Sequence, residues 1–142
     1  MTQYSGLAGI YDDLMQGIDY DEWAAYIEEL VDKHGGVPIK KALDLACGTG
    51  STTLALARSG YQVIGLDLSA EMLFVAKVKT TKENLPQVTY RQADMREFTL
   101  PERVGLVVSF QDGINYLLTE DDFKRTAMNV HQVLLPGGLF YL

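Results

Sequence analysis

The chain has 142 residues, of which 47% are hydrophobic and 22% are charged, a composition typical of one folded domain and not of a disordered segment. Its formal net charge of −7 disfavours nucleic acid as a partner, because proteins that bind it place Lys and Arg against the phosphates. We find no membrane-spanning apolar stretch and no secretion signal at the start. We therefore expect a cytoplasmic protein that handles a small molecule.

The first third of the chain predicts a helix followed by a buried strand. Apolar residues recur at three- and four-residue steps from Asp21, and Gly35 with Gly36 supplies the positive φ that favours a helix end. Residues 41–46, KALDLA, are too few for a helix of their own and mostly apolar. Such a run is typical of a central strand that is covered on both faces in a parallel sheet.

Alternation of helix and strand continues after this first strand. Residues 51–59 predict a helix with Gly60 just past its end, and residues 61–69 predict a second strand. Ser69 is suited to cap the next helix, which carries Met72 on its apolar side. The order strand, helix, strand, helix is typical of a doubly wound α/β sheet.

The last third repeats the same pattern. Residues 88–94 and 103–112 predict the third and fourth strands, and Thr119 with Asp122 has the spacing of a capping box at the start of a helix. Residues 136–138, PGG, are expected to close that helix before a fifth strand begins at residue 139. The α/β fold class is thus predicted from element order alone.

The turn after the first strand is the natural place for a ligand, because doubly wound sheets bind ligands beyond the carboxyl ends of their strands. Gly48 and Gly50 let backbone N–H groups approach a ligand, and the next helix presents its partly positive end. Asp67 ends the second strand, where an acidic partner for two ribose hydroxyls is expected. A dinucleotide turn requires a third small residue, but Thr53 stands there, which disfavours NAD.

The motif DLACGTG, residues 44–50, resembles the first motif of class I S-adenosylmethionine-dependent methyltransferases, acidic-x-G/A-x-G-x-G. Further motifs follow in the order and at the spacings of that family: GLDLSAEML at 65–73, QADM at 92–95 and LLPGGLFYL at 134–142. The resemblance implies a Rossmann-like, mostly parallel sheet of strand order 3-2-1-4-5 with helices on both faces. Residues 1–142 are expected to form one domain, with an N-terminal helical lid at 1–36 that resembles glycine N-methyltransferase-like enzymes and a core at 37–142.

The same resemblance implies S-adenosylmethionine as the cofactor and S-adenosylhomocysteine as the product. Asp67 is expected to hold the ribose, whereas Asp94 and the Met95 backbone N–H are expected to read the adenine ring. The other implied cofactor contacts are Leu68 and Met72 beside the ring, Tyr4 and Tyr11 over the methionine part, Ala46 and Gly48 through their backbones, and Phe110 near the adenosine or sulfonium.

Methyl transfer is an in-line displacement at a carbon that the sulfonium already activates, so alignment of the acceptor supplies most of the acceleration. A general base is optional. Where a proton must leave the acceptor, Asp112 and Tyr116, after the fourth strand, are the nearest candidates. No other catalytic residue and no metal site is expected, and the single cysteine, Cys47, is interpreted as a small loop residue.

Several polar and aromatic residues have simpler interpretations. Asp44 either contacts the cofactor or orders the glycine loop through hydrogen bonds. Residues expected to be structural or solvated are His34 and His131 at helix ends, Trp23 and Tyr26 in an apolar stripe, and Glu28, Glu29 and residues 120–122 on solvated surface or at a helix start.

The favoured function is methyl transfer to a small nitrogen- or oxygen-bearing acceptor. The alternatives are a cofactor-binding fragment without turnover and, less favoured, an NAD-dependent oxidoreductase. Class I methyltransferases have seven strands, so the chain is expected to lack about two and to expose the edge of its fifth. We expect that edge, at residues 139–142, to pair with another molecule or to leave the chain unstable.

Overall fold

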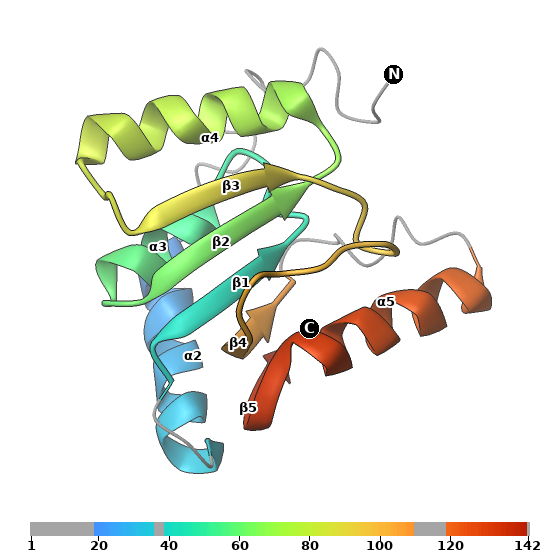
Figure 1. Ribbon diagram of the computed structural model, residues 1–142. Coiled ribbons are helices and arrows are strands. Elements are labelled where there is room, and N and C mark those ends of the chain that lie inside the picture. The colour runs from blue at the N-terminus through green and yellow to red at the C-terminus, as the bar shows by residue number, and fades with distance from the viewer. Residues whose placement is uncertain (1–18, 36–38, 110–118, 142) are drawn as a thin grey trace.

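The computed structural model describes residues 19–35, 39–109 and 119–141, which form a parallel five-stranded sheet with helices on both faces (Figure 1). The strand order is β3-β2-β1-β4-β5, which confirms the predicted order and fold class. The elements are α2 (Tyr20–His34), β1 (Lys41–Leu45), α3 (Ser51–Arg58), β2 (Gln62–Asp67), α4 (Ala70–Glu83), β3 (Val88–Gln92), β4 (Val104–Val108), α5 (Glu120–Val133) and β5 (Leu134–Tyr141).

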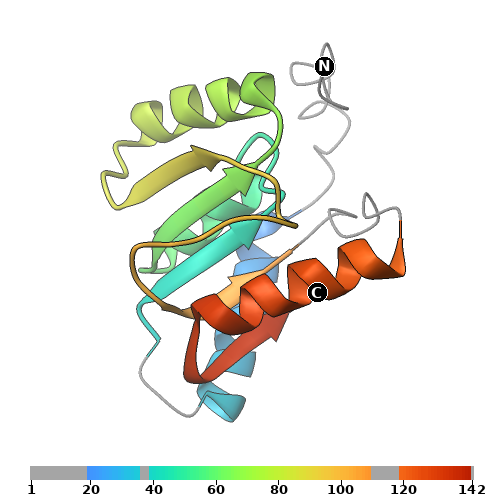
Figure 2. The ribbon, with the colours of Figure 1, turned by 45° about the vertical axis from the view of Figure 1, so that its right-hand side comes forward.

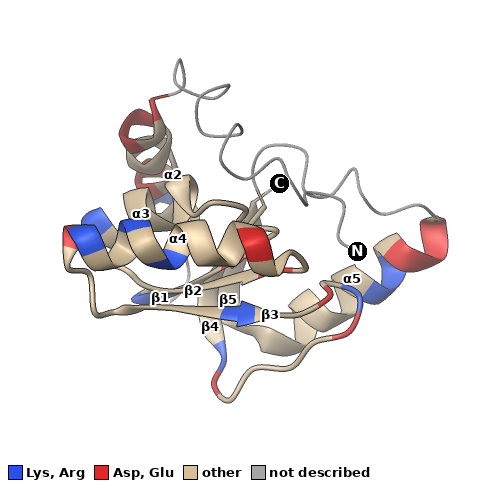
Figure 3. Ribbon diagram, turned by 90° about the horizontal axis from the view of Figure 1, so that it is seen from above, with Lys and Arg blue, Asp and Glu red and all other residues tan. Residues whose placement is uncertain are grey.

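The sheet separates two layers of core. Seen from above, α2, α3 and α4 lie on one side of the sheet and α5 lies on the other (Figure 3). Successive residues of β1 point to opposite faces, so that Ala42 packs in the core under α2 and α3 whereas Leu43 packs in the core with Val130 of α5. The connection between β3 and β4 runs over the α5 face (Figure 2), where its Phe98 joins the same core.

Burial explains which strands are central. Every residue of β4 is buried, as are the last four residues of β1, because both strands are covered on both faces. The edge strand β3 is less covered: Val88 is buried, Tyr90 is partly buried, and Thr89, Arg91 and Gln92 are exposed. None of the helices in the described ranges combines the length and the apolar character needed to span a membrane.

The predicted helix caps are largely confirmed. The Ser69 side chain accepts a hydrogen bond from the Met72 N–H at the start of α4, and Thr119 accepts from the Asp122 N–H at the start of α5. The prediction for the end of α2 was wrong for Gly35, whose φ is −70°. There the Gly35 N–H donates to the Val31 carbonyl, so an extended residue ends the helix without a left-handed turn.

The start of β5 was also predicted wrongly. The strand begins at Leu134, directly after α5, and PGG lies within it and does not precede it. The pairing of β4 with β5 shifts register between Val104 and Leu106. The additional residues of β5 form an irregularity there, which an edge strand can accommodate. A side chain at Gly138 would come within 2.9 Å of the Gly105 carbonyl, which explains a glycine in this bulge.

Tyr90 packs the glycine turn against the sheet. A side chain at Gly65 of β2 would lie 2.7 Å from the Tyr90 ring, and one at Gly50 would lie 2.8 Å from the Tyr90 hydroxyl. The hydroxyl also forms a 2.7 Å hydrogen bond with Thr80 of α4. Burial raises the pKa of the Tyr90 phenol, so it stays neutral. Tyr90 therefore fixes the distance between β2, α4 and the turn.

Candidate functional site

The turn between β1 and α3 has an unusual backbone. Ala46, Gly48 and Gly50 have φ values of 55°, 58° and 86°, so alternate residues adopt the left-handed conformation. A non-glycine residue such as Ala46 adopts this conformation at a cost, and such strain concentrates at ligand sites. Gly50 is the N-cap of α3 and offers no side-chain hydrogen bond. The first N–H groups of α3 thus lack a side-chain cap and are suited to a ligand.

Asp67 lies against this turn because β1 and β2 are parallel neighbours, with Leu45 paired to Leu66. Its carboxylate accepts a 2.8 Å hydrogen bond from the Gly48 N–H and another of 2.8 Å from the Ser69 N–H. The residue is only 3% exposed, and this burial raises the pKa of the carboxyl group. The Gly48 N–H is therefore used within the protein, and Asp67 joins the turn to the start of α4.

Asp44 on β1 is buried beneath the turn, with 1% of its surface exposed. Its Oδ2 accepts hydrogen bonds from the hydroxyls of Thr52 (2.6 Å) and Thr53 (2.7 Å) on α3. Its Oδ1 is buried and has no hydrogen-bond partner among the described residues. Burial raises the pKa of Asp44 to about 6, and the nearby Asp67 charge adds to the effect. A buried carboxylate oxygen without a partner costs folding free energy unless a ligand or a water molecule donates a hydrogen bond to it.

Asp94 lies just past the end of β3, at the same edge of the sheet. Arg96, which the sequence analysis missed, holds it: Nη2 donates to Asp94 Oδ2 at 2.6 Å and Nε donates to Oδ1 at 3.0 Å. This guanidinium holds the pKa of Asp94 below its ordinary value. Asp122 lies at a helix start as expected, in the first turn of α5; it is 8% exposed and pairs with Arg96 at 3.4 Å. Arg96 stands two positions after Asp94 in the sequence, and this spacing of opposite charges was the available signal.

The residues expected beside the adenine ring differ in exposure. Leu68, directly after Asp67, is an apolar residue that is 51% exposed. Met72 has no exposed surface, so its contact with a ring requires a neighbouring group to move. Met95 is partly buried against the α5-side core. The structure thus brings Asp67, Leu68 and the turn together, and the ring contacts stay a prediction.

Five expected site residues lie outside the described ranges: Tyr4, Tyr11, Phe110, Asp112 and Tyr116. The lid, the aromatic contacts and the two candidate bases therefore stay predictions. Cys47 is buried in the turn, and burial raises the pKa of its thiol, which agrees with its interpretation as a small loop residue.

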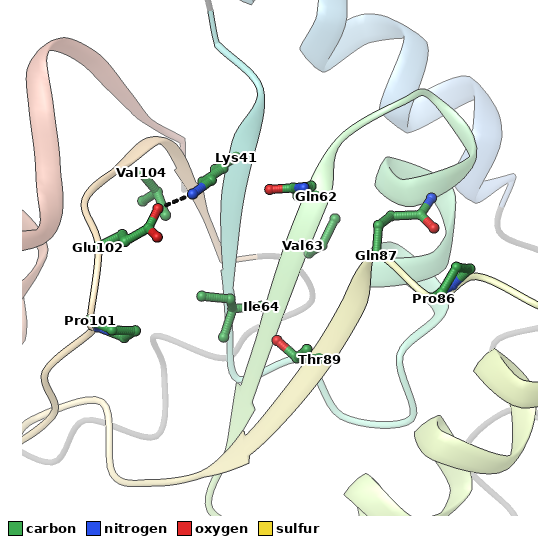
Figure 4. Close-up of a pocket in the computed structure, with 10 residues that line it drawn as sticks. All are labelled: Lys41, Gln62, Val63, Ile64, Pro86, Gln87, Thr89, Pro101, Glu102 and Val104. Carbon is green, nitrogen blue, oxygen red and sulfur yellow. Dashed lines mark hydrogen bonds and ion pairs between the residues drawn. The ribbon is translucent and has the colours of Figure 1, made fainter.

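A hollow of about 320 Å³ lies away from the turn, at the amino ends of the strands (Figure 4). Lys41 begins β1 and Gln62 begins β2, and both line it, together with Gln87 just before β3. The charged groups in it, Lys41 and Glu102, pair with each other. Ligands of doubly wound sheets bind at the opposite, carboxyl end, so this hollow is not the candidate site.

Comparison with known proteins gives a family match over more than half of the chain. Residues 42–138, which include the turn, Asp67 and Asp94, match a family model described as a methyltransferase domain. The chain belongs to this methyltransferase domain family. The NAD alternative loses its support, since the family match points to methyl transfer and not to hydride transfer.

Relatives extend over nearly the whole chain. A putative methyltransferase of Bacillus subtilis, YqeM, is 39% identical over 96% of this chain and 53% of its own length. A dTDP-3-amino-3,4,6-trideoxy-α-D-glucopyranose N,N-dimethyltransferase of Streptomyces venezuelae is 33% identical over 93% of this chain and 54% of its own length. The chain thus spans about half the length of these curated relatives.

The fold also matches solved structures of methyltransferases over most of the chain. An S-adenosylmethionine-dependent methyltransferase from Clostridium acetobutylicum superposes with a TM-score of 0.84 at 30% identity, over 99% of this chain and 57% of that one. Some neighbouring structures hold S-adenosylmethionine or S-adenosylhomocysteine. The glycine N-methyltransferase-like branch expected from the sequence stays a prediction.

Proposed function

We propose that the chain is the S-adenosylmethionine-binding part of an enzyme that methylates an amine on a small molecule. The observation that carries the proposal is the buried Asp44 Oδ1, which has no partner among the described residues and lies beneath the uncapped start of α3. Asp67, at the end of β2, accepts a hydrogen bond from the Gly48 N–H of the same turn. A ligand with both a cationic end and a ribose fits two carboxylates of this kind.

The two carboxylates have different tasks in this proposal. Asp67 accepts from the two ribose hydroxyls, because each of its oxygens takes one N–H bond in the structure and retains a second lone pair. Asp44 Oδ1 faces the ammonium of the methionine part, whose charge offsets the cost of burying an ionised carboxyl group. The Thr52 and Thr53 hydroxyls fix the Asp44 carboxylate in that direction.

Methyl transfer itself needs little from the protein beyond alignment. The acceptor nitrogen uses its lone pair to form a bond to the methyl carbon, the carbon–sulfur bond breaks with its electron pair going to sulfur, and the methylated ammonium then loses a proton. Holding the acceptor in line with the carbon–sulfur bond supplies most of the acceleration. Asp112 and Tyr116 remain the candidates to receive the proton.

An amine on a sugar is the acceptor class that we favour. The Streptomyces venezuelae relative is named for dimethylation of a 3-amino sugar nucleotide, and a solved neighbour from Micromonospora echinaspora is described as an amino pentose methyltransferase. Both are similar to this chain over more than nine-tenths of its length. Neither similarity alone identifies the acceptor of this protein, since about half the length of each of these relatives has no counterpart in this chain.

The experiment is methyl transfer by the full-length protein from labelled S-adenosylmethionine to paired acceptors, each amino sugar nucleotide beside its hydroxyl counterpart. We expect label in the amino sugars and none in the hydroxyl partners. Label in the hydroxyl sugars alone would contradict the amine proposal. Binding of S-adenosylhomocysteine with no transfer to any acceptor would favour the second candidate, a cofactor-binding protein without turnover.

A further inference from the structure

Arg96 occupies a central place between two parts of the fold that are far apart in sequence. Its guanidinium donates to both oxygens of Asp94, just past the end of β3, and its Nη1 donates to Asp122 Oδ1 in the first turn of α5. The Arg96 backbone N–H also donates to Asp94 Oδ1 at 2.9 Å. One residue therefore holds the Asp94 carboxylate from its main chain and from its side chain.

The segment around Arg96 is fixed in further ways. The Glu97 N–H donates to the Asp94 carbonyl at 2.9 Å, which closes a tight turn. Asn129 of α5 donates from its side chain to the Met95 carbonyl at 3.3 Å. Because α5 packs on the sheet through a buried core, these contacts tie the orientation of residues 94–97 to the body of the domain.

Asp94 still has capacity to accept another hydrogen bond. A carboxylate offers about four lone-pair positions, and Oδ2 has only one short bond, the 2.6 Å bond from Arg96 Nη2, besides a shared one at 3.1 Å from Nε. The Asp94 side chain keeps 30% of its surface exposed. A planar guanidinium that grips one edge of a carboxylate leaves the other edge pointing in a fixed direction.

We propose that Arg96 is a positioning residue that sets the selectivity of the site for an adenine amino group. It does so by fixing the direction and the negative charge of Asp94, which then accepts from the exocyclic amine. This inference rests on the proposed function. It differs from the general role of Asp94 because it assigns the selectivity to a residue that does not touch the cofactor.

The test compares two ligands by calorimetry on the full-length protein: S-adenosylhomocysteine and its deaminated analogue, S-inosylhomocysteine. The analogue carries a carbonyl where adenine carries an amine, so a fixed carboxylate repels it. In the Arg96→Met variant we expect the ratio of the two dissociation constants to fall by about fivefold or more, since hydrogen bonds to charged groups are the stronger ones. A ratio of affinities does not depend on the fraction of protein that is folded.

Two comparisons separate this role from a structural one. Arg91→Met removes the same side chain from β3, where Arg91 donates to the Thr99 carbonyl and not to Asp94, and it should leave the ratio unchanged. In an Asp94→Asn background, Arg96→Met should cause no further fall, because the arginine acts through Asp94. Arg96→Gln replaces Arg96→Met should the latter fail to fold.

The outcomes are distinct. A wild-type protein that binds neither ligand contradicts the proposed function itself. A wild-type protein that binds both ligands equally contradicts the reading of adenine by Asp94, and the Arg96 proposal fails with it. Discrimination that persists in Arg96→Met, or that falls equally in Arg91→Met, overturns the Arg96 proposal alone.

Discussion

Asp67→Ala is expected to weaken binding of S-adenosylhomocysteine by about 100-fold, because it removes hydrogen bonds to two ribose hydroxyls and each bond to a charged group contributes about 1.5–3 kcal/mol. The substitution also leaves the Gly48 and Ser69 N–H groups without their acceptor, which loosens the turn and the start of α4. Isothermal titration calorimetry on the purified protein measures the change directly.

Two further variants make this prediction specific. Asp67→Asn keeps the shape of the side chain and an acceptor for one of the two N–H groups, but its NH2 faces the other, so we expect it to fold with lower stability and to bind about tenfold more weakly. Glu29→Ala removes an exposed carboxylate from α2 and should bind as the wild type does. Unchanged affinity in both Asp67 variants, with a native circular dichroism spectrum, would remove Asp67 from the site.

Asp44 is expected to make the stability of the ligand-free protein depend on pH. Its pKa is about 6 in the folded protein and about 3.9 in an unfolded chain. A raised folded pKa gives stability that is complete below pH 4 and is lost as the pH rises through 6. This one group therefore lowers the free energy of unfolding by about 2 kcal/mol between pH 4 and pH 7.

Asp44→Asn should remove that part of the pH dependence, since the amide oxygen still accepts from Thr52 and Thr53 but cannot ionise. Urea unfolding of both proteins at pH 4.5 and pH 7 gives the difference. Other buried or paired carboxyl groups, such as Asp67 with a raised pKa and Asp94 with a lowered one, contribute equally to both proteins and cancel in this difference. Asp121→Asn, at an exposed position of α5, is the matched control. Parallel pH curves for wild type and Asp44→Asn would contradict the assignment.

Ligand binding should follow the opposite course. The ammonium of S-adenosylhomocysteine pairs with ionised Asp44, so affinity should fall as the pH drops below 6, and binding near pH 6 should release protons. In Asp44→Asn, binding should be weaker at pH 7 and should depend less on pH than in the wild type. Calorimetry in two buffers of different ionisation enthalpy detects the released protons. Asp44 is thus expected to destabilise the ligand-free protein at neutral pH and to gain a charged partner when the ligand binds.

Local patterns in the sequence predicted the fold well because each element carries its own signals. The apolar run around Leu43, the Ser69 cap and the spacing of Thr119 with Asp122 all depend on residues within four positions of each other. The boundary at β5 failed for the same reason. Whether PGG precedes a strand or bulges within it depends on the register with β4, which is a long-range property.

The site was predictable where it follows the backbone and not where it depends on contacts across the fold. Asp67 and the glycine turn come from strand ends and glycine spacing. The Arg96–Asp122 pair joins residues 26 positions apart in the sequence, and the contact of Tyr90 with Gly50 depends on β3 lying across from α3. Such contacts have no local periodicity, so side chains that orient the expected ligand-binding residues are the ones that sequence reasoning missed.

The most direct test of the account is a crystal structure of the protein with S-adenosylhomocysteine. We expect density for the ribose within hydrogen-bond distance of Asp67 and for the ammonium next to Asp44 Oδ1. Density for the nucleoside in the hollow of Figure 4, at the amino ends of the strands, with nothing at the turn, would contradict the account.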